Sequence, residues 1–359
     1  MKEKKRLLIL GFWQFGYTTA VFKHCEFSRD EFDITYLGWD YEDPKIELPG
    51  IKVLYVSRKS NIIVRNLRLL HKAHKEIQKG YDIVFANYIK GISLVRLLNP
   101  KTKFILYVIT MGVTYSKLKR WLFDTMVKLE LRAFKNIVLI NSGLAKKLRV
   151  NKYDILTMGG NCFSKKEKSF DKLSLLYVGT LGNRNVINCV KGFHRFITEN
   201  NALKEDETSR FVIVGDTLQN ELKEIRQYVK ENKLENYIFT PGFIHQEGLY
   251  PYFEEANIGV AYVPITPYFQ NQPPTKTYEY LVSGLPVIAT ATAANSEIVL
   301  PVAGELVKDN AESFYEGLKK MNQRKSEFTS EKIKKLYSED TWERMVRTKF
   351  IPLIHKYAD

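Results

Sequence analysis

The sequence predicts an α/β protein with two Rossmann-like domains in tandem, each built around a doubly wound parallel sheet. Its 359 residues exceed the roughly 250–300 at which a single hydrophobic core stops growing. Short apolar runs alternate with longer amphipathic stretches in both halves, which is typical of parallel strands joined by helices. Sheets of this kind bind ligands at the carboxyl ends of their strands, and we expect the two sheets to face a common cleft.

In the first half, six apolar runs predict strands, at 7–11, 32–37, 51–56, 83–86, 104–109 and 137–141. Apolar residues recur at helical spacing in 62–78 and 117–134, which predicts helices there. A shorter helix is expected at 143–148, with Ser142 as its N-cap. Segment 117–134 mixes basic with bulky apolar residues and could lie on an anionic membrane, although packing of its apolar stripe on the sheet is the favoured interpretation.

The alternation weakens at 158–172, where two glycines precede a run of lysines, and this polar stretch predicts the domain linker. Beyond it, strands are expected at 173–178, 211–214, 237–240, 258–261 and 287–289, and helices at 186–197, 221–232, 248–255 and 275–283. These elements divide the chain into an N-terminal domain (1–160), a C-terminal domain (161–340) and a terminal helix (341–359) expected to cross back to the first domain.

The net charge of +15 is concentrated in the first half: residues 1–170 hold 32 Lys and Arg against 15 Asp and Glu. This asymmetry suggests an anionic partner such as membrane lipid, a phosphorylated acceptor or nucleic acid, and general solubility is the plainer alternative. The sequence contains no apolar run near the roughly 20 residues that span a bilayer. Three widely spaced cysteines fit a reducing compartment. We expect a cytoplasmic protein, peripheral at the inner face of the membrane.

The most informative motif is Gln272-Pro-Pro-Thr-Lys-Thr-Tyr-Glu-Tyr-Leu-Val-Ser-Gly-Leu-Pro-Val-Ile-Ala289. The prolines predict a helix that starts near Thr275, whose free backbone N–H groups would form a phosphate site. Lys276 adds a positive charge, and the Glu279 carboxylate one turn further on could accept two hydrogen bonds from a ribose diol. On spacing alone, an ordinary helix with a Lys–Glu pair explains the motif equally well.

This motif resembles the donor-site signature of the group 1 (family 4) glycosyltransferases, which have the GT-B fold. The resemblance implies that Glu279 binds the ribose of a nucleotide sugar and that Lys276 lies near the diphosphate. The segment 175–182, Leu-Leu-Tyr-Val-Gly-Thr-Leu-Gly, resembles the strand and glycine turn that open the family's C-terminal domain, followed here by Arg184 as a phosphate-facing cation. Segments 214–216 and 239–261 resemble the family's next turn and its nucleobase segment.

The resemblance therefore implies a site for a UDP- or GDP-linked sugar in the C-terminal domain and an acceptor site in the N-terminal domain. The implied site residues are Gly179, Thr180, Arg184, Thr275 and Lys276 for the diphosphate, Glu279 for the ribose, Gly242, Phe243 and Ile244 for the base, Asn271 and Gln272 for the donor sugar, and Gly11, Trp13, Gln14, Gly16 and Thr110 for the acceptor. Transfer to a polysaccharide or lipid-linked glycan, with no cofactor and no metal, is the implied activity.

Two departures from the family pattern concern catalysis. Asn271 stands where the family often has an acidic residue, and an amide cannot stabilise positive charge as a carboxylate does. Thr110 to Val113 replace the segment in which many members carry a catalytic histidine, so no catalytic residue is assigned. The absence of a base agrees with a retaining reaction, and inversion stays open.

Three other functions are compatible with part of the sequence. A sugar-nucleotide epimerase of the same fold would need more acid and base residues than the motifs supply. A catalytically silent scaffold would explain the missing histidine. A nucleic-acid-binding protein is suggested only by the basic charge, without the clustered basic and aromatic residues that such binding requires.

Overall fold

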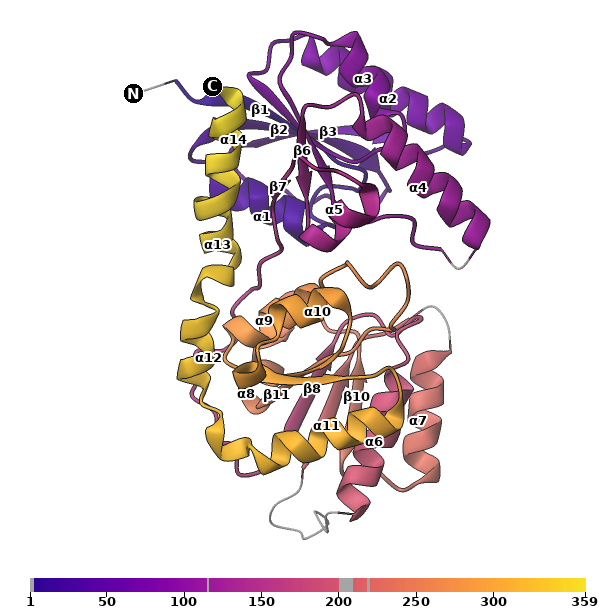
Figure 1. Cartoon of the computed structure of the whole chain (residues 1–359), viewed down its shortest axis with the longest axis vertical. Coiled ribbons are helices and arrows are strands. Elements are labelled where there is room, and N and C mark those ends of the chain that lie inside the picture. Colours follow the sequence, from indigo (N-terminus) through magenta and orange to yellow (C-terminus); the bar gives the residue numbers. More distant parts are fainter. Residues whose placement is uncertain (1–2, 115, 200–208, 218–219) are drawn as a thin grey trace. The chain divides into compact units, whose positions relative to one another are not determined.

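The computed structural model describes residues 3–114, 116–199, 209–217 and 220–359. The chain forms two compact units, unit 1 (Met1–Met158 and Trp342–Asp359) and unit 2 (Gly159–Thr341). The sequence analysis placed the corresponding boundaries at 160/161 and 340/341. Each unit contains its own hydrophobic core and its own sheet (Figure 1).

Unit 1 is built on a seven-stranded parallel sheet with the order β3-β2-β1-β4-β5-β6-β7. Its strands are β1 (Lys5–Leu10), β2 (Phe32–Asp40), β3 (Ile51–Ser57), β4 (Ile83–Asn87), β5 (Phe104–Val108), β6 (Asn136–Leu139) and β7 (Asp154–Ile155). The order reverses between β1 and β4, and the carboxyl ends of strands at such a switch point are the usual place for a ligand.

Two groups of helices cover the two faces of this sheet. One group contains α2 (Ile62–Ile77), α3 (Ile92–Leu98), α4 (Lys117–Leu131) and α5 (Ser142–Leu148). The other contains α1 (Thr19–Ser28) and the C-terminal segment, which runs through α13 (Trp342–Met345), the π-helical turn η5 (Val346–Phe350) and α14 (Ile351–Ala358). The start of β1 and the end of α14 lie close together in unit 1 (Figure 1), where Lys5 forms an ion pair with Asp359.

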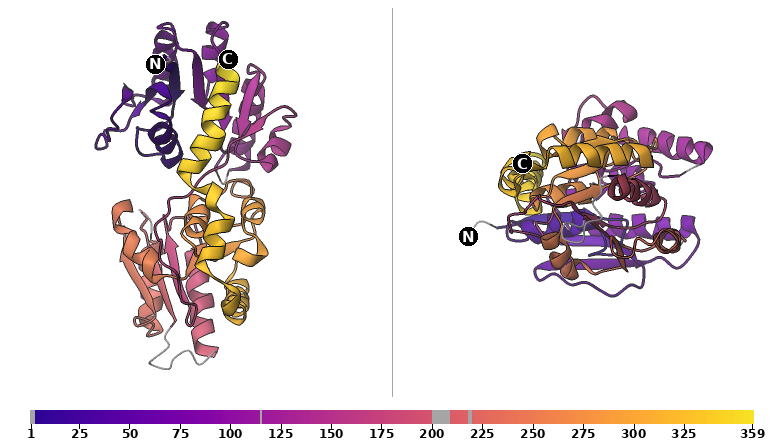
Figure 2. Two further views of the ribbon diagram at one scale, coloured as in Figure 1. Left: turned by 90° about the vertical axis from the view of Figure 1, so that its left-hand side faces the viewer. Right: turned by 90° about the horizontal axis from the view of Figure 1, so that it is seen from below.

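Unit 2 repeats the plan with a six-stranded parallel sheet in the order β10-β9-β8-β11-β12-β13, which has helices on both sides (Figure 1 and Figure 2). The strands are β8 (Ser174–Val178), β9 (Arg210–Val214), β10 (Ile238–Gly242), β11 (Ile258–Ala261), β12 (Val287–Thr290) and β13 (Gly304–Val307). The helices are α6 (Val186–Glu199), α7 (Glu221–Glu231), α8 (Tyr250–Glu255), α9 (Thr275–Val282), α10 (Ala293–Ile298), α11 (Ala311–Gln323) and α12 (Ser330–Leu336). Short 3₁₀ turns, η1 (Gln246–Gly248), η2 (Pro301–Ala303), η3 (Lys325–Glu327) and η4 (Ser338–Asp340), lie between some of them.

The structure corrects one predicted helix cap. Ser142 is the first residue of α5, and Asn141 is the N-cap, because its side-chain oxygen accepts a hydrogen bond from the Leu144 N–H at 2.9 Å. The preceding strand therefore ends at Leu139, two residues earlier than the apolar run suggested.

Helix α4 exposes more of its apolar surface than the sequence analysis favoured. Val127 and Leu131 are buried against the core, whereas Leu118, Trp121 and Leu122 are exposed. Within the described residues, no helix is both long and apolar enough to cross a membrane.

Candidate functional site

The turn after β8 brings two backbones into close contact. Gly179 and Gly215 both have positive φ, +138° and +150°, and a Cβ added to Gly215 would lie only 1.9 Å from the Gly179 carbonyl oxygen. The Gly179 N–H donates to the Val214 carbonyl at 3.0 Å. A side chain at Gly215 would therefore push apart the ends of β8 and β9, which form the floor of the predicted diphosphate site.

Lys276 lies directly beside this turn. Its Nζ is 3.6 Å from the centroid of the buried Tyr177 ring, and a Cβ on Gly179 would come within 2.8 Å of it. Burial, reinforced by the positive charge of Arg184, lowers the pKa of Lys276 to about 7, and the carboxylate of Glu279 acts in the opposite direction. The amine is thus poised to gain a proton when an anion arrives.

Arg184 comes from the loop between β8 and α6, and its guanidinium stacks 4.4 Å from the centroid of the Phe269 ring. Phe269 was not predicted as a site residue, because it lies in the irregular segment before α9 where the sequence carries no periodicity. The stacking fixes the direction of the cation without using its N–H donors.

Helix α9 begins at Thr275, as the prolines predicted, and Pro274 at its N-cap position makes no side-chain hydrogen bond to the helix. Thr275 and Lys276 therefore occupy the first turn, where backbone N–H groups and the helix dipole favour an anion. Glu279 follows one turn later on the same face and is half-buried.

The predicted nucleobase segment continues directly from β10. The Gly242 carbonyl accepts a hydrogen bond from the Gly215 N–H at 2.8 Å, which ties this segment to the end of β9. Phe243 is exposed, with its ring packed edge-to-face on His245, while Ile244 packs against the core of unit 2. The ends of β8 and β10 thus carry the glycine turn of the predicted diphosphate site and the predicted base residues along one edge of one sheet, with the end of β9 between them.

Gln272 has an open hydrogen-bonding capacity. Its side-chain oxygen Oε1 is buried and has no hydrogen-bond partner among the residues that the structure describes. Asn271 precedes it, and Gln270 is used structurally, because its side chain accepts from the Ala293 N–H at 2.8 Å. A buried carbonyl without a donor is costly, so Gln272 is well suited to a ligand hydroxyl.

In unit 1 the loop after β1 is tightly built. A Cβ on Gly11 would lie 2.0 Å from the Tyr36 hydroxyl, and Gly16 has a φ of +91° beside Ile46. Trp13 is exposed, and its ring stacks on Tyr41 at a centroid distance of 5.0 Å. The two glycines are therefore required by packing within the loop.

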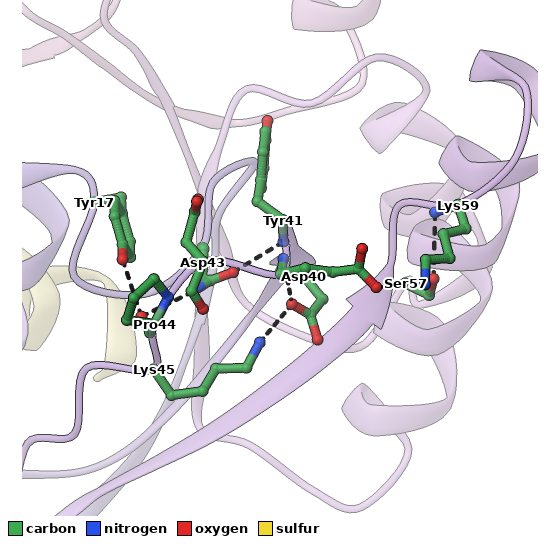
Figure 3. Close-up of polar contacts among 10 residues, drawn as sticks. Tyr17, Asp40, Tyr41, Asp43, Pro44, Lys45, Ser57 and Lys59 are labelled. Atoms are coloured by element: carbon green, nitrogen blue, oxygen red, sulfur yellow. Dashed lines mark hydrogen bonds and ion pairs between the residues drawn. The ribbon is translucent and has the colours of Figure 1, made fainter.

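Gln14 was predicted to be available for an acceptor sugar, but in the structure its side chain forms hydrogen bonds with the backbone of a neighbouring loop. It is 1% exposed, and its amide donates to the Asp43 carbonyl at 2.7 Å and accepts from the Tyr41 N–H at 2.9 Å. Figure 3 shows the loop that it holds, in which Asp40 pairs with Lys45 and the Tyr17 hydroxyl donates to the Pro44 carbonyl at 3.0 Å. Gln14 is thus a structural residue of this loop.

Thr110 lines a cavity of about 360 Å³ in unit 1. The cavity lies at the carboxyl ends of β1, β2, β4 and β5, and the loop residue Phe12 also contributes to it. Its other principal residues come from separate segments and were not predicted from the sequence: Trp39, Arg65, Asn87, Tyr88, Lys90 and Phe123. Trp39 and Asn87 lie at the carboxyl ends of β2 and β4, which is the signal that strand-end reasoning could have used. Arg65 and Phe123 come from the helices α2 and α4.

His245 adjoins the predicted base segment through Phe243, and no histidine among the described residues lines the unit 1 cavity. His24 is buried, His74 and His194 contact Asn99 and Tyr228, and His355 pairs with Glu31. No group of three or more potential metal ligands occurs within the described ranges. A separate cavity of about 1030 Å³ in unit 2 lies beside the linker and the edge strand β10 and contains none of the predicted site residues.

Comparisons with known proteins bear on the family and the fold of the chain. Residues 172–323 match the family model described as Glycosyl transferases group 1. No curated protein sequence matches the chain significantly.

Similar solved structures cover nearly the whole chain. Sucrose-phosphate synthase from Thermosynechococcus elongatus has a TM-score of 0.75 at 15% identity, covering 99% of this chain and 100% of that one. Anabaena HepE in complex with UDP and glucose has a TM-score of 0.72 at 11% identity, covering 98% and 99%. The lipopolysaccharide outer core galactosyltransferase WaaB has a TM-score of 0.71 at 13% identity, covering 98% and 99%. At these identities the similarity establishes the two-domain GT-B fold.

Proposed function

We propose that this chain, whose residues 172–323 match the model of the group 1 glycosyltransferases, transfers a sugar from a nucleotide-diphosphate sugar to a hydroxyl of a cell-surface polysaccharide or lipid-linked glycan. The observation that carries the proposal is the position of Lys276, which lies in the first turn of α9 beside the Gly179 turn. The charges of Arg184 and Glu279 act on its pKa in opposite directions.

Each part of the donor has a matching group in unit 2. The diphosphate is proposed to lie on the Gly179–Thr180 turn and the first turn of α9, with Lys276 and Arg184 as its cations. The Glu279 carboxylate accepts hydrogen bonds from the two ribose hydroxyls, and the backbone groups of Gly242 to Ile244 form hydrogen bonds with the edge of the base. The proposed donors are linked to UDP or GDP, whose bases are uracil and guanine, and the complex of HepE with UDP and glucose supports the first.

The sugar is proposed to contact Asn271 and Gln272, because the unpaired oxygen of Gln272 can accept a hydrogen bond from a sugar hydroxyl. In the transfer step, the bond between the anomeric carbon and the β-phosphate oxygen breaks, and the acceptor oxygen bonds to that carbon. The acceptor proton passes to the departing phosphate oxygen, and the nucleoside diphosphate leaves. The two cations offset the charge that develops on this leaving group.

We propose that the configuration at the anomeric carbon is retained and that no metal takes part. Retention follows if the leaving phosphate, rather than a side chain, accepts the acceptor proton, and the two cations would take the place of a metal at the diphosphate. Unit 1 is proposed to bind the acceptor, and its basic charge fits a peripheral position at an anionic membrane on the cytoplasmic side.

A donor-hydrolysis assay tests this function. The protein is incubated with UDP- and GDP-linked sugars, with and without a chelator, and release of the nucleoside diphosphate is measured. We expect release from one donor series, unchanged by the chelator and lost in Glu279→Ala. Absence of release from every donor, together with tight nucleotide binding, would favour a silent scaffold.

A further inference from the structure

The 360 Å³ cavity of unit 1 has an apolar wall and a cationic margin. Aromatic rings from three segments, those of Trp39, Tyr88 and Phe123, line it together with Ile109 and Met111. Its charged members are Arg65 and Lys90, and none of the described residues that line it is acidic. A cavity of this size is typical of a small-molecule site, and this one would attract an anion at its edge.

Each cation of the cavity lies next to an aromatic ring that also lines it. The Arg65 guanidinium lies 5.5 Å from the Trp39 ring centroid, and the Lys90 ammonium lies 5.2 Å from that of Phe123. Asn66 donates to the Lys90 carbonyl at 2.7 Å, which joins the Lys90 segment to α2. Both positive charges therefore lie beside aromatic rings of the cavity wall.

Three polar atoms in the cavity wall have no hydrogen-bond partner among the residues that the structure describes. They are the Asn87 Oδ1, the Trp39 Nε1 and the Arg65 Nε. Asn87 is only 1% exposed, and its Nδ2 is already used by the Leu10 carbonyl at 3.0 Å. Because buried polar atoms are nearly always paired, these three atoms indicate a ligand with both donor and acceptor groups.

The apolar character continues out of the cavity mouth. Ile62 and Val113 line the cavity and are 57% and 53% exposed. Apolar side chains on the same α2 helix and on α4, among them Ile63 and Leu118, are also exposed. An apolar chain longer than the cavity would therefore stay in contact with apolar protein surface.

We propose that this cavity binds an acceptor that is an anionic amphiphile, with its apolar chain among Trp39, Tyr88 and Phe123 and its phosphate against Arg65 and Lys90. This inference rests on the proposed function, because it names the acceptor class of the same enzyme. A plain sugar chain fits the cavity less well, since its many hydroxyls would meet a wall with few hydrogen-bonding groups. The Asn87 carbonyl accepts from a hydroxyl near the phosphate.

Calorimetric titration of the full chain with octyl phosphate, octanol and inorganic phosphate tests the proposal. We expect octyl phosphate to bind at least tenfold more tightly than either of the others, since only it offers both groups. Arg65→Gln should weaken octyl phosphate binding about tenfold, which corresponds to about 1.4 kcal/mol, and leave octanol binding unchanged. Val113→Trp, which narrows the mouth at an exposed position, should weaken both apolar ligands.

Arg68→Gln is the matched control, because it makes the same change one turn further along α2, outside the cavity, and should leave all three affinities unchanged. Equal binding of octanol and octyl phosphate, or of inorganic phosphate and octyl phosphate, would overturn the proposal, as would an Arg65→Gln variant that binds normally. UDP binding is measured on the same samples. UDP binding without octyl phosphate binding overturns this inference alone, whereas octyl phosphate binding without UDP binding overturns the proposed donor site alone.

Discussion

The ammonium nitrogen of Lys276 lies 3.6 Å from the centroid of the Tyr177 ring. This contact joins the last buried part of β8 to the first turn of α9, the two elements that form the proposed diphosphate site. The ring offsets part of the cost of removing the ammonium from water, but it supplies no hydrogen-bond acceptor. The donor capacity of Lys276 therefore remains available for phosphate oxygens.

Binding of the donor should depend on pH through Lys276. The pKa of Lys276 in the free protein is lowered to about 7, chiefly by burial, and a bound diphosphate will raise it. The affinity for a UDP- or GDP-linked sugar, whose phosphates do not titrate near neutrality, is therefore expected to be constant below pH 7. It should fall by up to about tenfold for each pH unit above that value.

Lys276→Arg provides the comparison, because a guanidinium stays protonated throughout this range. Its affinity, measured by calorimetry between pH 6 and 8.5, should vary by less than about twofold. A parallel decline in the wild type and the variant would show that another group controls the binding.

Gly215→Ala should destabilise the protein by more than an ordinary glycine substitution. The new Cβ would lie 1.9 Å from the Gly179 carbonyl oxygen, so β8 and β9 must separate. Gly50→Ala is the control: Gly50 also has a positive φ, +85°, but its Cβ would meet no atom within 4 Å. We expect a loss of about 1 kcal/mol for Gly50→Ala and of several kcal/mol for Gly215→Ala, measured by thermal melting; equal losses would contradict the close contact.

Gln272→Ala should affect the sugar and spare the nucleotide. Removal of the unpaired Oε1 acceptor is expected to weaken binding of the sugar nucleotide by about five- to tenfold, the value of one hydrogen bond of about 1–1.4 kcal/mol. Binding of the bare nucleoside diphosphate should not change. The comparison of the two ligands by calorimetry assigns Gln272, and a uniform loss would place it at the nucleotide.

His24 should make unit 1 less stable in acid. Burial lowers the pKa of His24 to about 3, and its ring stacks on Phe350 at a centroid distance of 4.4 Å. Above the unfolded pKa of about 6.5 both states are neutral and the stability is complete. Between about pH 6.5 and 3 the unfolded chain binds a proton that the folded chain excludes, so stability falls as the pH is lowered.

His24→Phe keeps an aromatic ring stacked on Phe350 but removes the imidazole that binds a proton in the unfolded chain. The difference in the free energy of unfolding between variant and wild type, measured by urea denaturation, should shift in favour of the variant as the pH falls from 7 to 4, by an amount on the order of a few kcal/mol. A difference that is independent of pH would show that His24 is protonated in the folded protein.

Most strands of the two sheets could be predicted from the sequence, because strands of a parallel sheet are buried on both faces and appear as short apolar runs. The sequence analysis missed α1, since the buried face of that helix contains His24, Cys25 and Ser28 and shows no apolar stripe. It also missed β13, a strand of four residues that includes a glycine and a glutamate.

The predictability of the sites depended on how their residues are spread along the chain. The residues of α9 occur in one continuous motif, so their spacing and a helix start placed Thr275, Lys276 and Glu279 on one helix, and the resemblance to the family assigned them to the donor. The cavity of unit 1 is assembled from separate segments, and no local pattern joins Trp39 to Asn87. Gln14 was misjudged because its partner Asp43 lies 29 residues away.

Titration with UDP and GDP, followed by calorimetry, tests the donor site most directly. The wild type is compared with Lys276→Ala and Glu279→Ala, and with the surface controls Lys335→Ala and Glu331→Ala on α12, which make the same changes of charge at exposed positions. We expect one nucleotide to bind, and both donor-site variants to bind it at least tenfold more weakly while the controls bind normally. Failure of both nucleotides to bind at millimolar concentration, or equal binding by all five proteins, would contradict the assignment of the donor site to α9.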